Sequence, residues 1–132
     1  MSLLLLDTTF LIDAERGDVT LDDAIDDDDD VAIAAVTVAE LLVGVRLASG
    51  KRQDARQVYV EEILESLPII AYDRNVAVEH AELLVAVREQ GRPRGAHDLL
   101  IAATARATDR TIVTADHEAF TDLPGVATVI HR

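Results

Sequence analysis

Short apolar runs alternate with longer amphipathic stretches along the whole chain. The apolar runs predict strands at residues 3–6, 31–35, 68–72, 111–114 and 126–130. The stretches between them space their apolar residues as helices do, and they predict helices that end near Gly17 and that cover residues 37–48, 53–66, 74–90 and 97–108. Asp73 directly precedes one of these helices and is placed to cap it, and the "GRPRG" run of residues 91–95 predicts a turn.

This alternation indicates strands that are joined by helical crossovers. Crossovers of this kind produce parallel strands with helices on both faces of the sheet. We therefore expect a three-layer α/β/α sandwich with a mostly parallel central sheet. The 132 residues suit a single domain over positions 1–132.

The composition narrows the chemistry of the core and of any site. Hydrophobic residues make up 49% of the chain and aromatic residues only 3%, so the core must be aliphatic. The chain has no cysteine, which excludes disulfides, thiolate-bound zinc and thiol nucleophiles. No segment has the length of a membrane span or the pattern of a signal peptide, so we expect a cytoplasmic protein.

The charge is strongly acidic. The 25 acidic and 12 basic residues give a formal net charge of −13, which argues against nucleic-acid binding through a broad basic surface. Divalent cations can nevertheless bridge an acidic pocket to phosphate, so a nuclease stays possible. A basic protein partner also fits this charge.

Five consecutive acids form the only low-complexity segment, at positions 26–30. Their mutual repulsion predicts a solvated loop. A calcium loop is the alternative, but the run lacks the spaced acids and the glycine of the helix–loop–helix calcium site.

Four carboxylates are placed where strands end or helices begin. Asp7 follows the first strand, Glu40 lies early in the helix after the second strand, Asp98 begins an apolar helix, and Asp116 lies two residues past the strand at 111–114. Taken singly, an Asp at such a place is most often a helix cap. Glu40 has apolar neighbours, so a metal or an arginine should compensate it. Because ligands of α/β sheets bind beyond the carboxyl ends of the strands, the four acids together predict a site.

Four converging carboxylates require a cation. Their hard oxygens suit Mg²⁺ or Mn²⁺, which make a bound water more acidic and stabilise charge on phosphoryl oxygens. Thr9 and Thr114 lie near these acids and are candidates for supporting hydrogen bonds, with ordinary structural hydroxyls as the alternative.

The motifs "LLLLDTTFLID", "VAELLVG", "AHDLLIAATA" and "IVTADHEAF", in this order, resemble a PIN domain and more narrowly the VapC toxins of prokaryotic type II toxin–antitoxin pairs. The resemblance covers almost the whole chain. It implies a metal-dependent endoribonuclease with catalytic and metal-binding acids at Asp7, Glu40, Asp98 and Asp116, and with supporting hydroxyls at Thr9 and Thr114.

The chain departs from the family pattern at one position. Many relatives carry an acid or polar residue just before the closing Phe, where this chain has Ala119. Glu118 and Asp122 are nearby acids that do not match the motif, so the resemblance supports one tightly held ion and leaves a second open.

The resemblance also implies partners. It predicts an RNA substrate, a VapB-like antitoxin and a homodimer or a larger toxin–antitoxin assembly. The antitoxin tail would place a basic side chain in the acidic pocket, and the helices over residues 40–66 would hold the tail. Basic residues that flank the crevice in sequence are candidates for phosphate contacts, with solvated surface charges as the alternative: Arg46, Lys51, Arg52, Arg92 and Arg94. His97 is expected to be a surface or capping residue.

Two other functions compete with this interpretation. A phosphoacceptor receiver domain needs a lysine after its last strand, and the only lysine here, Lys51, lies between two helices. A PIN-like module that binds without cutting is the second alternative, and the presence of all four acids counts against it.

Overall fold

The structure is a computed structural model that describes residues 1–17 and 21–131. Its sheet has five strands in the order β3-β2-β1-β4-β5, and every neighbouring pair is parallel. The strands are β1 (Leu3–Leu6), β2 (Asp30–Ala34), β3 (Ile69–Ile70), β4 (Thr111–Thr114) and β5 (Thr128–Ile130). The predicted sheet is thus confirmed, and it is parallel throughout.

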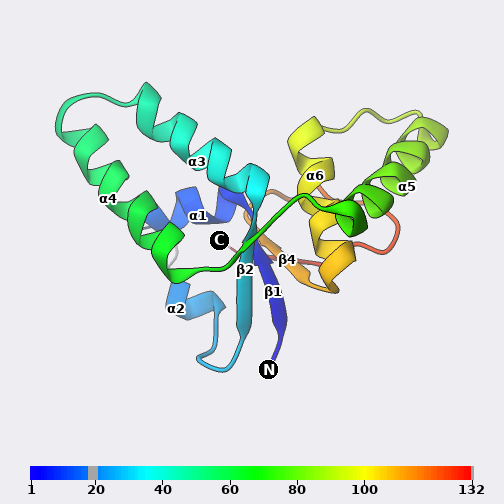
Figure 1. The fold of residues 1–132 in the computed structure, drawn as a ribbon, viewed down its shortest axis with the longest axis horizontal. Helices are drawn as coiled ribbons and strands as arrows, with labels where there is room; N and C mark the ends of the chain where they lie inside the picture. Colours follow the sequence, from blue (N-terminus) through cyan, green and yellow to red (C-terminus); the bar gives the residue numbers. More distant parts are fainter. Residues whose placement is uncertain (18–20, 132) are drawn as a thin grey trace.

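Helices cover both faces of this sheet. They are α1 (Thr8–Glu15), α2 (Leu21–Ala24), α3 (Ala35–Leu47), α4 (Gly50–Ser66), α5 (Arg74–Gln90) and α6 (Ala96–Thr108). Helices α3 and α4 form an arm on one side of the strands, and α5 and α6 form an arm on the other side (Figure 1). This arrangement confirms the three-layer α/β/α sandwich.

Two hydrophobic cores lie on opposite faces of the sheet, because successive strand residues point to opposite sides. Leu5 of β1 packs in the core that contains residues of α5 and α6. Its neighbours Leu4 and Leu6 pack in the core that contains residues of α1, α3 and α4. Burial of β1 on both faces explains its uninterrupted leucines.

Most predicted elements are found, with shifts at their ends. β1 and β4 begin and end as predicted, and Asp73 caps α5 by accepting a hydrogen bond from the Val76 backbone N–H. The predicted strand at 31–35 ends at Ala34, because Ala35 is already the first residue of α3. The strand predicted at 68–72 is limited to Ile69–Ile70, and that predicted at 126–130 to Thr128–Ile130.

The strand register brings the first and fourth strands to the same edge of the sheet. Leu6 of β1 pairs with Val113 of β4, and the Asp7 backbone N–H donates to the Val113 carbonyl over 3.1 Å. Asp7 and Thr114 therefore leave the sheet side by side although they are far apart in the sequence. Within the described residues, no helix is both long enough and apolar enough to cross a membrane.

Candidate active site

Asp7 is a buried carboxylate that is held by three hydrogen bonds. It is 2% exposed and is the N-cap of α1, where its Oδ1 accepts from the Phe10 backbone N–H at 2.9 Å. Burial raises the pKa of Asp7, while the hydrogen bonds it accepts act in the opposite direction. The capping role and the position at the strand end thus coexist in one fixed side chain.

Thr9 and Thr114 supply the other two hydrogen bonds to Asp7. The Thr9 hydroxyl donates to Oδ1 over 2.8 Å, and the Thr114 hydroxyl donates to Oδ2 over 2.6 Å. Thr114 also accepts from the Asp116 backbone N–H at 3.0 Å, and Thr9 accepts from the Ala115 N–H at 3.2 Å. The two threonines therefore connect Asp7 to the segment that carries Asp116.

Glu40 extends from α3 toward α1 and α6. Thr8 donates its hydroxyl to Glu40 Oε1 over 2.7 Å, and His97 Nδ1 lies 3.3 Å from Glu40 Oε2. Among the described residues, the partners of this half-buried acid are a threonine and a histidine and not the predicted arginine, and the predicted metal stays a prediction. His97 is 58% exposed, as expected for a surface residue.

Asp98 lies in the first turn of α6, where it interacts electrostatically with all three other acids. Burial, the largest effect, raises the pKa of Asp98 to about 6. The charges of the other acids contribute to the same rise, in the decreasing order Asp116, Asp7 and Glu40. The four predicted residues are therefore electrostatic neighbours at one end of the sheet.

Asp116 caps the turn that follows β4. Its Oδ1 accepts from the backbone N–H groups of Glu118 and Ala119 at 2.9 and 3.1 Å. These bonds orient one carboxylate oxygen and leave the other without a role in the turn. Asp116 is thus oriented by backbone, as Asp7 is.

An open hollow beside Asp116 contains further acids. Its lining includes Thr9, Asp13, Asp116 and Glu118. Asp13 is absent from the predicted site, although its position four residues after Thr9 on α1 is a sequence signal that the two share one helix face. Asp122, the other acid considered near Ala119, pairs instead with Arg92 over 2.8 Å.

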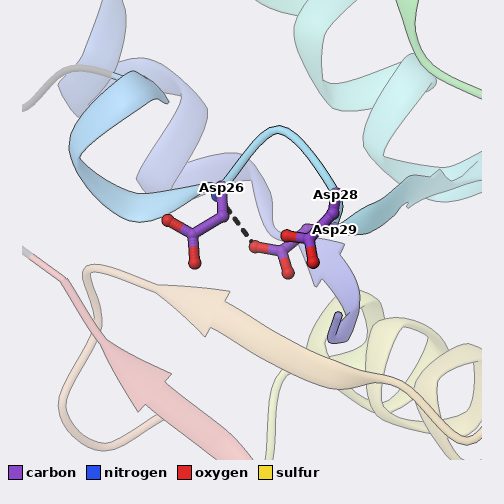
Figure 2. A group of neighbouring side chains, drawn as sticks. All are labelled: Asp26, Asp28 and Asp29. Atoms are coloured by element: carbon purple, nitrogen blue, oxygen red, sulfur yellow. Dashed lines mark hydrogen bonds between the residues drawn. The ribbon is translucent and has the colours of Figure 1, made fainter.

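The described residues contain a second group of acids in the loop before β2 (Figure 2). Ligand oxygens of Asp26, Asp28 and Asp29 lie within 4.8 Å of one another, which is the only such trio in the part of the chain that the structure describes. Asp29 accepts from the backbone N–H groups of Ser2 and Asp26, each at 2.9 Å, and these bonds lower its pKa. The Met1 amino group lies 3.3 Å from Asp28. The loop is solvated, as predicted, and its charge is partly offset by the start of the chain.

Comparison with known proteins identifies the family. The family model described as "PIN domain" matches residues 4–126. The chain belongs to the PIN domain family. It is 35% identical over 124 residues to Ribonuclease VapC5 of Mycobacterium tuberculosis, covering 94% of this chain and 90% of the relative. It is 33% identical over 96 residues to Toxin FitB of Neisseria gonorrhoeae, and this match covers 70% of this chain and 69% of the relative.

Solved structures of this PIN domain type agree with the fold. The crystal structure of VapBC2 from Rickettsia felis, bound to a DNA fragment from its promoter, aligns with a TM-score of 0.88 at 25% identity, covering 98% of this chain and 99% of the other. The VapBC-5 toxin–antitoxin structure from Mycobacterium tuberculosis aligns with a TM-score of 0.79 at 31% identity. The alignment covers 100% of this chain and 99% of the other.

Proposed function

We propose that this PIN domain is a metal-dependent endoribonuclease and the toxin of a toxin–antitoxin pair, active in the cytoplasm. The single observation that carries the proposal is the placement of Asp7, Glu40, Asp98 and Asp116 at one end of the sheet, close enough that the charges of the other three acids act on Asp98. Relatives that are named ribonucleases, such as VapC5, match the chain over nearly its whole length.

The residues at this edge of the sheet suit a hard divalent cation. Their donors are carboxylate oxygens, the ligands that Mg²⁺ and Mn²⁺ prefer. The pKa of Asp98 is raised first by burial and then by the negative charge of the other three acids, and a bound cation would offset both effects. We assign the cation to Asp7, Asp98 and Asp116, with Glu40 as the fourth acid of the site. A bound Mg²⁺ or Mn²⁺ would neutralise charge on the phosphate and acidify the attacking water.

The chain's own groups prepare the site for this chemistry. Thr9 and Thr114 donate hydrogen bonds to the two oxygens of Asp7, so the Asp7 carboxylate is already oriented before the reaction begins. Thr8 fixes one oxygen of Glu40 and leaves the other beside exposed His97. Glu40 Oε2, beside exposed His97, and Asp116 Oδ2, which makes no hydrogen bond in its turn, are the carboxylate oxygens open to accept a proton from the attacking water.

We assign the antitoxin to the groove that α3 and α4 form with α1. A pocket there begins at Glu40 and extends past Gly44 to Arg56 and Tyr59. Arg56 is held inside it by Glu15, 3.1 Å away. Val43 and Leu47, which lie three residues after Glu40 and Gly44 on α3, are 52% and 83% exposed and offer apolar surface on the same side of the helix. The related VapBC-5 structure is of a member of a family of toxin–antitoxin systems, and a similar solved structure from Klebsiella pneumoniae is a toxin–antitoxin complex. We also propose that two copies of this chain form a homodimer.

Cleavage of RNA by the purified chain tests the proposal. We expect cleavage with Mg²⁺ or Mn²⁺, none with excess chelator, and a loss of about 100-fold or more in Asp98→Asn, since removal of a metal-binding carboxylate weakens binding of the cation that neutralises the phosphate. Asp54→Asn, an exposed acid of α4, is the matched control. Equal cleavage by the unchanged chain and Asp98→Asn would refute the site assignment. Tight binding of RNA without cleavage under any metal condition would favour a binding module.

A further inference from the structure

The linker before α6 is bonded to the turn that carries Asp116. Arg94 lies in this linker, between Gly91 and α6, and its Nη1 donates to the carbonyls of Glu118 and Ala119 over 3.2 and 3.4 Å. Arg94 was a candidate for phosphate contact in the sequence, but here its guanidinium binds backbone.

The same turn is bonded to Asp116 from its other side. The N–H groups of Glu118 and Ala119 donate to Asp116 Oδ1, and the carbonyls of these residues accept from Arg94. The backbone of the turn thus lies between the guanidinium and the carboxylate. A shift of the turn away from Arg94 would move the donors that orient Asp116.

Arg94 is also attached by backbone to the place where Asp98 lies. Gly95, the next residue, is the N-cap of α6, and its carbonyl accepts from the Leu99 N–H at 3.1 Å. A Cβ atom on Gly95 would lie only 3.0 Å from Asp98 Oδ2, so the glycine allows the carboxylate to approach the backbone. The segment Arg94–Gly95 is therefore linked to both acids. Its backbone leads directly into the first turn of α6, which carries Asp98, and the Arg94 side chain binds the turn that follows Asp116.

The surroundings of Arg94 differ from those of Arg92 in the same linker. The second terminal nitrogen of Arg94, Nη2, is buried and meets no acceptor within the described part of the chain. An unused buried donor costs free energy, and the bonds from Nη1 to the two carbonyls are the hydrogen bonds that offset the burial of this guanidinium. Arg92 instead forms an exposed ion pair with Asp122, with side chains 57% and 69% exposed.

We propose that Arg94 is a positioning residue that sets the separation of the Asp98 and Asp116 carboxylates and thereby the affinity of the site for a divalent cation. The inference rests on the proposed function, because it concerns the same cation site. Arg94 does not contact the substrate in this role. It acts only through the turn at Glu118 and Ala119.

Calorimetric titration with Mn²⁺, combined with RNA cleavage at increasing Mn²⁺ concentrations, tests this role. We expect Arg94→Met to weaken Mn²⁺ binding by about 10-fold, the size typical for groups that orient metal ligands. Cleavage at saturating Mn²⁺ should stay within about 2-fold of the unchanged chain, because the reacting groups are intact. Arg94→Lys, which can still donate to a carbonyl, should recover part of the affinity, and Arg92→Met is the matched control.

The outcomes separate this inference from the proposed function. Equal Mn²⁺ affinity in Arg94→Met and Arg92→Met would overturn the role of Arg94 and leave the nuclease assignment standing. Loss of cleavage that saturating Mn²⁺ does not restore would also overturn it, since that result indicates a direct role in the reaction. No Mn²⁺ binding by the unchanged chain would overturn both. If Arg94→Met fails to fold, Arg94→Lys decides: affinity equal to that of the unchanged chain overturns the role.

Discussion

Ionised Asp98 destabilises the folded chain. Its pKa is about 6 in the folded state against an ordinary value of 3.8, so the folded state favours the protonated acid. The unfavourable contribution is absent below about pH 4, develops between pH 4 and pH 6, and is complete above pH 6. At neutral pH the chain therefore retains a carboxylate that weakens the fold, which is typical of a site kept for binding.

Asp98→Asn should consequently stabilise the metal-free protein. We expect the free energy of unfolding to rise by about 1 kcal/mol at pH 7.5, after allowing for the partial exposure of the side chain to solvent. The gain should shrink as the pH is lowered to 5, because the unchanged acid becomes protonated. Urea unfolding at the two pH values measures the difference.

Asp54→Asn is the control for this stability measurement, since Asp54 is exposed on α4. Its change should be a few tenths of a kcal/mol at most, the size typical of an exposed surface substitution. A destabilised Asp98→Asn variant at pH 7.5 would contradict the electrostatic description of the site.

The hydroxyl of Thr114 has the opposite effect on stability. It donates a hydrogen bond to Asp7 over 2.6 Å and accepts one from the Asp116 N–H. Thr114→Val removes both bonds and keeps the shape of the side chain. We expect the free energy of unfolding at neutral pH to fall by about 1–3 kcal/mol, because a buried carboxylate loses a donor. Thr128→Val, on exposed β5, is the matched control for chemical denaturation. Equal stability of the two variants would show that the Thr114–Asp7 bond contributes little.

At the scale of elements, helix caps differ in a way that stability measurements can detect. Asp73 accepts a hydrogen bond from the Val76 N–H at the start of α5, whereas Ser49 at the start of α4 makes no such side-chain bond. Asp73→Ala should therefore lower the free energy of unfolding by about 1 kcal/mol. Ser49→Ala should change it by a few tenths at most, and a similar loss in both variants would argue against the assigned caps.

The apolar patterns predicted most elements because they reflect burial directly. The four leucines of β1 and the "TIVT" run of β4 are buried on the sheet, and both strands match their predicted bounds. Helix α2, Leu21–Ala24, was not predicted, because four residues with two acids carry no helical periodicity. Short β3 also shows that an apolar run of strand length need not pair along its whole length.

The sequence predicts the acids of the candidate site but not the residues that orient them. Each acid could be placed at a strand or helix end, which is why Asp7 and Asp116 could be expected at one edge of the sheet. The partners that orient the acids come from packing between distant elements. Thr8 and His97 at Glu40, and Arg94 at the turn after Asp116, carry no local signal of these contacts in the sequence.

For the whole molecule, the net charge of −13 makes cation binding a source of stability. A cation that binds only the folded state should raise the midpoint of thermal unfolding by roughly 5–10 °C at concentrations about a hundred times its dissociation constant. The rise should be much smaller in Asp98→Asn. Sodium chloride at equal ionic strength controls for general screening, and an equal rise in both proteins would indicate screening alone.

The most direct test of the central claim compares the two acidic groups of the molecule as Mn²⁺ sites. Calorimetric titration would use the unchanged chain, Asp98→Asn, and a loop variant in which Asp26, Asp28 and Asp29 are all changed to Asn, since only the loop brings three carboxylates within 4.8 Å among the described residues. We predict that Asp98→Asn loses the tight Mn²⁺ site and that the loop variant keeps it. Tight binding retained by Asp98→Asn and lost in the loop variant would instead place the cation in the loop before β2 and refute the site at Asp98.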